Sequence, residues 1–365
     1  MDISQVYSPL KILHHYPRLQ EMKDGGHPAP ILVQLILSDF CSHSCQFCSY
    51  RLEGYTSNQL FGILKADGTV NNNPKRMIPY EKAREILTDC QGMGVKAIEF
   101  TGGGESTVHP DFCDIVDWTN SLGLDYSLVT HGGHLKQKLR ESLRNATWIR
   151  VSLDAGSDET YSEVRRIPRG SFQKTLHNFD ALVSERTRKD QVLGISFVVT
   201  KENWREIITA AEIAKDLGAD YFRIGAFFSQ YEEQYYEGIY EHVQEMCEEA
   251  ALLTTPTFRV FNQFKGRISD LVQKSPSYKT CGHMQFNTYI GGDLSVYRCC
   301  ALAYNDRGYL GSLKDQSFSS LWNSQSVRDD FANFDARSCD RCPFNDKNKV
   351  MNYLLEENPP HRNFV

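Results

Sequence analysis

The sequence predicts an α/β fold, a partial (β/α)6 barrel of the TIM type followed by a small C-terminal domain built from a β-hairpin and a helix. Apolar runs typical of buried strands recur along the first 230 residues, and segments of helical periodicity stand between them. Strands that alternate with helices pair in parallel through right-handed crossovers. We count about six such units, fewer than the eight that close a full barrel, so we expect an open barrel whose functional face lies at the carboxyl ends of its strands.

The elements of this barrel follow one another in a regular order. The run "ILVQLILSDF" at residues 31–40 is expected to form the first strand. Further strands are expected at 96–101, 125–130, 147–154, 191–200 and 220–228, and helices at 80–94, 110–123, 135–143, 171–185 and 203–218. A long helix from about Glu232 to Leu253 is expected after the last strand. The C-terminal hairpin is expected to turn at "GGD", residues 291–293, and to precede a helix over 317–331.

Length, composition and charge limit the classes of protein. The chain has 365 residues, of which 41% are hydrophobic, and a formal net charge of −6, so no basic surface for a nucleic-acid polymer is expected. No apolar run approaches the ~20 residues of a membrane span, and no signal peptide is evident, so we expect a cytoplasmic protein.

We expect the chain to divide into four parts: an N-terminal extension over 1–30, the barrel over 31–255, the C-terminal domain over 256–350, and a tail over 351–365. Within the barrel, residues 49–79 are a candidate lid.

Eleven cysteines, an odd number, gather near the two ends of the chain, which favours metal binding over disulfides. Cys41, Cys45 and Cys48, in "CSHSCQFCSY", come directly after the first expected strand. Three thiolates in one loop can hold three irons of a cubane 4Fe-4S cluster and leave the fourth iron open to a substrate or cofactor. Zinc is the alternative, although a structural zinc site needs four ligands.

Other chemistry-bearing segments also follow expected strands. "TGGGESTVHP" follows the second strand, and its glycines, Gly102, Gly103 and Gly104, permit positive φ angles and close backbone approach, while Glu105 offers an acceptor for an ammonium group. Residues after the third, fourth and fifth strands add polar groups: Thr130, Ser152, Asp154 and Asn203. Because loops at one end of a parallel sheet converge, we expect these segments to surround one pocket.

The thiol triplet, with Phe47 before its last cysteine, and the glycine-rich segment resemble the radical S-adenosylmethionine (SAM) superfamily. The resemblance implies that the amino and carboxylate groups of SAM chelate the open iron and that the glycine-rich segment holds the SAM amino group. It also implies cofactor contacts for Thr130, Ser152, Asp154 and Asn203. In "YSEVRRIPRGSF" it implies an arginine that reaches the SAM carboxylate. The family usually has glycine directly after this arginine, whereas this chain has Arg166 and then Ile167, so Arg165 and Arg166 both stay open.

The C-terminal cysteines suffice for a second, closed site. Cys281 and Cys299 flank the expected hairpin, and Cys339 and Cys342 form a C-x-x-C pair after the expected helix. This pattern resembles the SPASM and twitch extensions, and the lack of a cysteine after Cys342 is similar to the shorter, twitch-like form with one auxiliary 4Fe-4S cluster. Cys300 is the alternate to Cys299, because neighbouring side chains of a strand point to opposite faces. A zinc-ribbon-like site is the competing interpretation.

The resemblance implies an enzyme that takes an electron from a low-potential donor such as flavodoxin or ferredoxin and cleaves SAM to methionine and a 5′-deoxyadenosyl radical. We expect the substrate to be a small molecule, because only about 30 residues precede the first strand, too few for a leader-peptide-binding domain. We expect the reaction to be an oxidation or dehydrogenation, with the auxiliary cluster as electron acceptor. Epimerisation, rearrangement or crosslinking of a peptide or nucleoside is the alternative. Epimerisation or rearrangement would make the enzyme an isomerase rather than an oxidoreductase, whereas crosslinking is itself an oxidation. Candidates to return a hydrogen atom are Cys247 and Tyr235, although such residues more often serve packing. A non-catalytic iron-sulfur or zinc scaffold or sensor is the alternative from another class.

Overall fold

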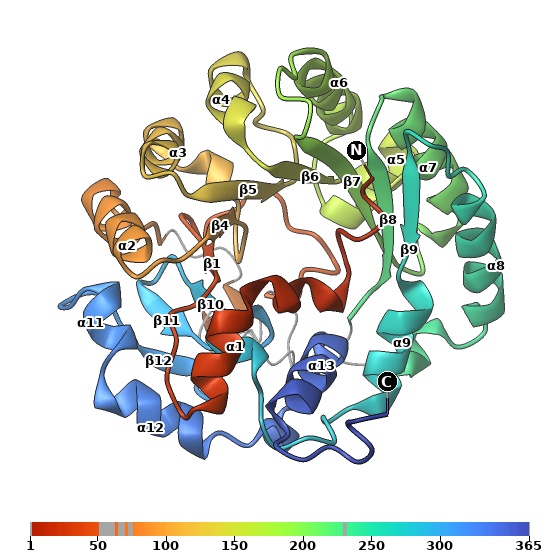
Figure 1. The fold of residues 1–365 in the computed structure, drawn as a ribbon. Helices are drawn as coiled ribbons and strands as arrows, with labels where there is room; N and C mark the ends of the chain where they lie inside the picture. Colours follow the sequence, from red (N-terminus) through yellow and green to blue (C-terminus); the bar gives the residue numbers. More distant parts are fainter. Residues whose placement is uncertain (1, 51–62, 65–69, 72–75, 229–231, 365) are drawn as a thin grey trace.

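The computed structural model describes residues 2–50, 63–64, 70–71, 76–228 and 232–364. Its main feature is a ten-stranded sheet with the order β12-β11-β10-β1-β4-β5-β6-β7-β8-β9. The sheet curves into an open barrel, and most of the helices lie on its outer side (Figure 1). The prediction of an α/β fold with a parallel sheet is confirmed.

The barrel strands are parallel neighbours along this sheet. They are β1 (Leu32–Leu35), β4 (Ala97–Phe100), β5 (Asp125–Thr130), β6 (Trp148–Ser152), β7 (Val192–Val199) and β8 (Tyr221–Ala226). The helices that cover them are α2 (Tyr80–Gly92), α3 (Phe112–Ser121), α4 (Gln137–Ser142), α5 (Asp158–Arg165), α6 (Ser171–Ser184), α7 (Ile207–Asp216) and α8 (Tyr240–Ala251). Each predicted strand and helix of the first 230 residues has a counterpart, because their apolar positions recur with the period of the element.

The strands bury their outward side chains and leave inward ones partly accessible. On β6, Ile149 and Val151 are fully buried, whereas Arg150 and Ser152, which alternate with them, keep accessible surface. Since successive side chains of a strand point to opposite faces, the buried set packs beneath the helices and the other set faces the barrel interior. The main hydrophobic core is therefore the layer between sheet and helices.

Further strands extend the sheet at both edges. At one edge, β9 (Arg259–Asn262) pairs in parallel with β8, although it lies in the range expected for the C-terminal domain. At the other, β10 (Asn287–Ile290) pairs in parallel with β1, and β11 (Ser295–Tyr297) and β12 (Tyr309–Ser312) continue the sheet antiparallel. The C-terminal hairpin is thus continuous with the barrel sheet.

Two predicted helices are interrupted. The helix expected from Glu232 to Leu253 is a 3-10 helix, η5 (Glu232–Tyr236), followed by α8, because Gly238 takes a left-handed φ of +80° that an α-helix does not allow. The helix expected over 317–331 is two helices, α11 (Phe318–Trp322) and α12 (Gln325–Asn333). The break comes at Ser324, whose hydroxyl accepts a hydrogen bond from Val327 N and so begins a new helix.

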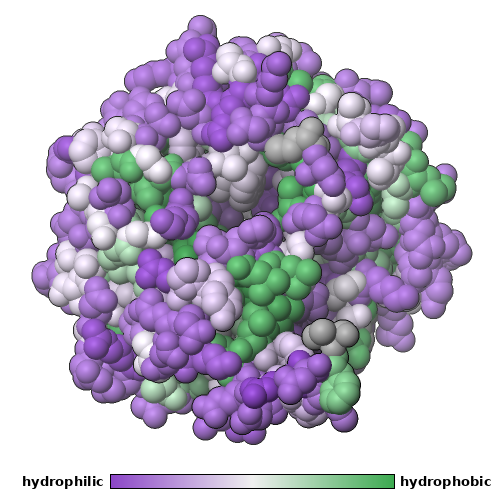
Figure 2. Space-filling model, in the orientation of Figure 1, coloured by the Kyte–Doolittle hydropathy of each residue, from purple (hydrophilic) through white to green (hydrophobic). Residues whose placement is uncertain are grey.

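The N-terminal segment lies across the barrel beside the last helix (Figure 1). Ile12, Leu19 and Ile31 pack with Phe286 and Met351 in a small separate core. The elements concerned are η1 (Pro9–His15), α1 (Tyr16–Lys23), α10 (His283–Phe286) and α13 (Asn345–Leu355). An apolar area over η1 is visible in Figure 2, where Leu10 and Leu13 are exposed.

The remaining elements are short. They are β2 (Ile63–Leu64), β3 (Val70–Asn71), η2 (Ser106–Val108), η3 (Leu143–Asn145), η4 (Trp204–Glu206), α9 (Phe264–Gln273), η6 (Cys300–Leu302) and η7 (Ala336–Ser338). Most of the candidate lid at 49–79 lies outside the described residues. In the described part of the chain, none of the helices has the length and apolar character needed to span a bilayer.

Candidate active site

The loop that carries the thiol triplet follows β1 and is held by α5. Ser44 N donates to the Arg165 carbonyl (3.1 Å), and Gln46 N donates to the carbonyl of Val164 (2.9 Å). The thiols of Cys41, Cys45 and Cys48 are partly buried. These bonds tie the loop to the end of α5, so the thiol triplet and the segment with the candidate arginines lie side by side.

Arg165 is the arginine that faces this loop. Its side chain is 3% exposed, forms an ion pair with Asp154, and brings Nη1 to 3.8 Å from Cys45 Sγ. Its guanidinium also lies 5.9 Å from the ring centre of Phe47. Arg166, by contrast, is exposed and ends α5 in a left-handed conformation with φ 51°. The structure thus brings Arg165, and not Arg166, to the predicted site.

Asp154 and Asn203 hold the ends of β6 and β7 together. The Asp154 carboxylate accepts a hydrogen bond from Val198 N (2.7 Å) as well as from Arg165. The Asn203 amide donates to the carbonyls of Asp154 and Val198, both at 2.9 Å. Ser152, at the end of β6, offers its carbonyl to Arg165. In this structure these polar groups therefore position Arg165 and the strand ends.

The glycine-rich segment lies against the start of the thiol loop. Glu105 N donates to the carbonyl of Phe40 (2.9 Å), and a Cβ on Gly104 would lie 2.4 Å from the carbonyl oxygen of Ser38. None of Gly102, Gly103 and Gly104 has a positive φ, contrary to one of our reasons for expecting glycine here. Close backbone approach, the other reason, is what the structure requires.

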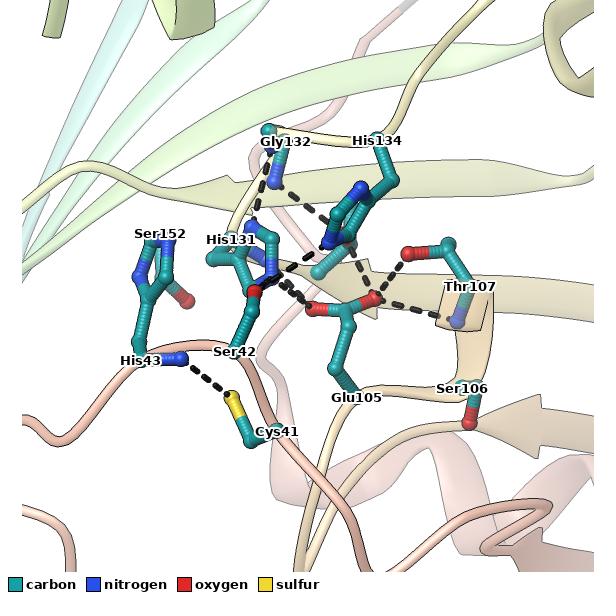
Figure 3. A network of polar contacts seen from close by, with 12 residues as sticks. Cys41, Ser42, His43, Glu105, Ser106, Thr107, His131, Gly132, His134 and Ser152 are labelled. Carbon is teal, nitrogen blue, oxygen red and sulfur yellow. Dashed lines mark hydrogen bonds and ion pairs between the residues drawn. The ribbon is translucent and has the colours of Figure 1, made fainter. Parts of the chain in front are cut away.

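Glu105 is the centre of a buried polar network (Figure 3). Its Oε1 accepts hydrogen bonds from Thr107 N (3.2 Å), Thr107 Oγ1 (2.6 Å) and Thr130 Oγ1 (2.8 Å), and its Oε2 accepts one from His131 N (2.9 Å). Burial alone would raise its pKa, but the His131 ring, which is charged only in acid, and these hydrogen bonds lower it below its ordinary value. Glu105 is therefore ionised, and its role as acceptor of the SAM ammonium stays a prediction.

Three histidines around this network were missed by the sequence reasoning. The rings of His43 and His131 stack with their centres 3.8 Å apart, and Ser42 Oγ lies 3.2 Å from His131 Nε2 and 3.1 Å from His134 Nε2. Burial lowers the pKa of His131 to about 4, so this ring is neutral at neutral pH. The signal was present in "CSHSC" and "THGGH", which both follow expected strands. A cavity of about 490 Å³ adjoins the network and is lined by Ser42, Thr107 and His134 among others.

Four C-terminal thiols converge at a second site. Besides burial, which is the largest effect, Cys300, Cys281, Cys339 and Cys342 all raise the pKa of Cys299, so the C-terminal thiols lie in one environment. Their surroundings supply hydrogen-bond donors: Tyr278 Oη lies 3.6 Å from Cys342 Sγ, and Asn348 Nδ2 lies 3.5 Å from Cys281 Sγ. Such donors commonly surround thiolate ligands of iron-sulfur clusters.

Cys300 lies beside this group. Burial has the largest effect on its pKa, followed by Glu99, Arg267 and Lys347. The choice of Cys299 over Cys300 as the fourth ligand stays a prediction. Among the described residues, no three His, Cys, Asp or Glu side chains are gathered to hold a single metal ion.

A buried junction joins the two sites. Asp39, two residues before Cys41, accepts hydrogen bonds from Tyr304 Oη, Gly292 N (3.1 Å) and Arg76 Nε (2.8 Å). Tyr304 follows Cys299 and η6, and Gly292 belongs to the β10–β11 turn. The strand that leads into the first thiol loop is therefore bonded to the segments on both sides of β11.

The two candidate hydrogen donors lie in different places. Cys247 lies on α8 and is fully buried in the core, where burial raises its pKa to about 12, and the structure does not bring it to either thiol site. Tyr235 lies near the carboxyl end of β7, where its Oη accepts a hydrogen bond from Lys201 N (3.1 Å). Burial raises its pKa to about 12 as well.

With this geometry in place, the chain can be compared with known proteins. Residues 35–214 match the family model "Radical SAM superfamily", and residues 281–343 match "Iron-sulfur cluster-binding domain", the SPASM model. The chain is 25% identical to the AdoMet-dependent heme synthase of Methanosarcina barkeri, over 82% of this chain and 84% of that protein. It is also 25% identical to the mycofactocin maturase MftC of Mycolicibacterium smegmatis, over 56% of this chain but 46% of that protein. The structure of Streptococcus suis SuiB bound to its precursor peptide SuiA resembles the fold, with a TM-score of 0.61 and 14% identity over 90% of this chain and 72% of that one.

The chain belongs to the radical SAM superfamily. Within it, the chain carries a C-terminal SPASM iron-sulfur domain. Its cofactors are accordingly SAM with a 4Fe-4S cluster and an auxiliary iron-sulfur cluster.

Proposed function

We propose that this enzyme oxidises or dehydrogenates a small molecule, with the auxiliary cluster as electron acceptor and an external low-potential carrier such as flavodoxin or ferredoxin as donor. When bound, SAM and its cluster supply a 5′-deoxyadenosyl radical that abstracts a substrate hydrogen atom. The observation that carries the proposal is the pairing of an open triplet with a group of four thiols in one continuous sheet. A cluster held by three thiols has an iron open to SAM and can initiate the reaction. A cluster held by four thiols can accept an electron.

The chain's own residues have separable tasks in this proposal. Cys41, Cys45 and Cys48 would hold the open cluster, and Arg165, 3.8 Å from Cys45 Sγ, would orient the carboxylate of SAM as a buried cation. Glu105 and its network fix the loops after β4 and β5 around the cofactor.

The four C-terminal thiols would hold the auxiliary cluster, as the electrostatic coupling of Cys299 to Cys281, Cys339 and Cys342 supports. Epimerisation, rearrangement or crosslinking of a peptide or nucleoside remains the second candidate reaction. The match to a peptide-bound SuiB structure is at 14% identity and concerns the fold.

Anaerobic reconstitution tests the cluster assignments. We expect about eight irons per chain for two cubanes. Cys299→Ser should lose about four of them, whereas Cys300→Ser, the matched control one residue away, should keep all. Equal losses in both variants would contradict the assignment of Cys299.

Formation of 5′-deoxyadenosine tests the enzyme proposal. Reconstituted protein with dithionite and SAM should form this product, and Cys45→Ala should not. A protein that assembles its clusters yet neither binds SAM nor forms the product would be a scaffold or sensor instead. The state of the auxiliary cluster after turnover, read by electron paramagnetic resonance, separates oxidation from the isomerase alternative, because only oxidation delivers an electron to it.

A further inference from the structure

The barrel interior carries charged side chains at mid-strand positions. Glu99 is the third residue of β4, Arg150 the third of β6 and Arg223 the third of β8. All three alternate with fully buried neighbours that face the helices, and all three keep accessible surface although they lie on central strands of the sheet. Side chains in a packed core would have no such surface, so these residues line an internal space.

The groups around this space interact across it. Glu99 influences the pKa of Arg150 and also that of Lys347 on α13. These residues come from β4, β6 and α13. This influence between elements far apart in the sequence agrees with the inward positions of Glu99 and Arg150 on their strands.

The positive charges of this interior lack carboxylate partners. Arg150 Nη1 lies 3.5 Å from Tyr7 Oη, and its Nε is buried without a hydrogen-bond partner. Arg223 Nε donates to the neutral amide of Gln263 at 2.7 Å. Within the described ranges, neither guanidinium forms an ion pair with a carboxylate. Glu99 is the facing carboxylate, and it accepts a hydrogen bond from Gln34 at 2.9 Å.

The two arginines differ in how far their charge is compensated. Burial would lower the pKa of Arg150, but Tyr7, Tyr221 and Glu99 raise it above its ordinary value, whereas Arg223 keeps an uncompensated positive charge. Burial, with added repulsion from Arg150 and Arg267, lowers the pKa of Arg223 to about 10. Burial alone would raise the pKa of Tyr7, yet Arg150 and Arg223 lower it below its ordinary value. Arg267 itself lies 3.5 Å from Asp270 and is therefore partly compensated. Buried cations without partners are costly, and an anionic ligand removes that cost.

We propose that the barrel interior binds a substrate with an anionic group, a carboxylate or a phosphate, which Arg150 and Arg223 receive. This inference rests on the proposed function, because it names the substrate class of the same site. Ser152, whose carbonyl binds Arg165, lies two residues beyond Arg150, roughly 6.7 Å along the strand. A small molecule anchored at the arginines would therefore extend toward the SAM-binding loops. Guanidinium groups suit this task because they bind carboxylate and phosphate through two parallel hydrogen bonds.

Binding of defined anions to the reconstituted full-length protein tests the anchor. Calorimetry would use pyrophosphate and citrate as the phosphate and carboxylate probes, and sucrose as the neutral probe. We expect at least one anion to bind and sucrose not to. Arg223→Gln should weaken anion binding by about tenfold or more, since it removes a charge-assisted hydrogen bond, and Arg223→Lys should weaken it less. Arg144→Gln, which removes an exposed arginine of η3, is the matched control and should bind as the wild type does.

The outcomes are distinct. Loss of anion binding in Arg223→Gln, with partly retained binding in Arg223→Lys, supports the inference. The anion that binds more tightly shows whether the site prefers phosphate or carboxylate. Equal anion affinity in Arg223→Gln, Arg144→Gln and wild type would mean surface binding only and would overturn it. If Arg223→Gln does not fold, as judged by circular dichroism, the comparison of Arg223→Lys with Arg144→Gln decides in the same way.

A second measurement addresses the substrate itself. A small-molecule cell extract is separated on an anion exchanger, and each fraction is added to wild-type enzyme with SAM and dithionite. We expect only the retained, anionic fraction to raise 5′-deoxyadenosine formation above the rate without substrate. Stimulation confined to the unretained fraction would overturn the inference while leaving the proposed function intact. A wild-type enzyme that never forms 5′-deoxyadenosine would instead refute the proposed function, and the calorimetry would still decide on the anion site.

Discussion

Replacement of Glu105 by glutamine keeps the shape of the side chain and removes its charge. In the structure both carboxylate oxygens face donors only: two hydroxyls and one backbone N–H at Oε1, and His131 N at Oε2. The amide nitrogen of glutamine must therefore point its hydrogens at another donor. The least costly arrangement places it at Oε2, where it leaves His131 N without an acceptor.

We expect this change to destabilise the protein by about 2–3 kcal/mol, because one hydrogen bond to a charged group is lost and a buried donor is left unsatisfied. Urea denaturation of the apoprotein near neutral pH measures the difference. Glu163→Gln, at an exposed position of α5, is the matched control and should change the stability by no more than about 0.5 kcal/mol.

The pH dependence gives a second check on the same carboxylate. The folded-state pKa of Glu105 lies below its ordinary value, so its contribution is complete above the unfolded pKa of about 4.3 and is lost as the pH falls through the folded pKa. The stability difference between wild type and Glu105→Gln should therefore be largest near neutral pH and shrink in acid. If the two proteins unfold at the same urea concentration near neutral pH, the network does not hold Glu105 as an anion and the reasoning is wrong.

Two further substitutions test other buried contacts. Arg165→Met should cost about 3–5 kcal/mol of stability, because it leaves Asp154 buried without its cation. Arg166→Met, at the exposed neighbouring position, is the control and should cost far less. Urea denaturation of both variants measures the difference. Tyr304→Phe removes the hydrogen bond to Asp39 without changing the packing volume, and we expect a loss of about 1.5–3 kcal/mol in the same assay. An unchanged midpoint for Tyr304→Phe would show that the junction does not join the two thiol sites energetically.

The sequence predicts the barrel well because the patterns that indicate its strands, helices and motifs are local. Helix and strand periods, and a functional motif directly after each strand, can be recognised within ten or fifteen residues. The parallel pairing of β10 with β1 could not be found in this way, since it joins Leu32 to Asn287 and no local pattern specifies a partner so distant. Strand β9 was also missed, because its residues lie in the range that we assigned to the C-terminal domain and its partner β8 is specified only by tertiary packing.

For the candidate site, the sequence identified groups but not their partners. Nothing in the sequence distinguishes the role of Arg165 from that of Arg166. Only the left-handed end of α5 decides which of the two side chains points inward. The glycines were expected for their φ angles, yet what limits Gly104 is the backbone of Ser38 and Asp39 against it. Such distinctions depend on the approach of segments about 60 residues apart, so they follow from tertiary packing rather than from motif spacing.

The charged interior is the informative exception, because part of its signal is local. A parallel sheet buried on both faces usually reads as a continuous apolar run, yet "TWIRVS" and "KAIEF" alternate apolar and polar residues. In an antiparallel sheet this alternation indicates a face in water. In a barrel whose outer face is covered by helices, the polar positions can only face the inside, so Arg150 and Glu99 indicate a hollow interior that a polar ligand can fill. The same reasoning applies to Arg223 on β8, and it makes the charge of the inward positions a guide to the charge of the substrate.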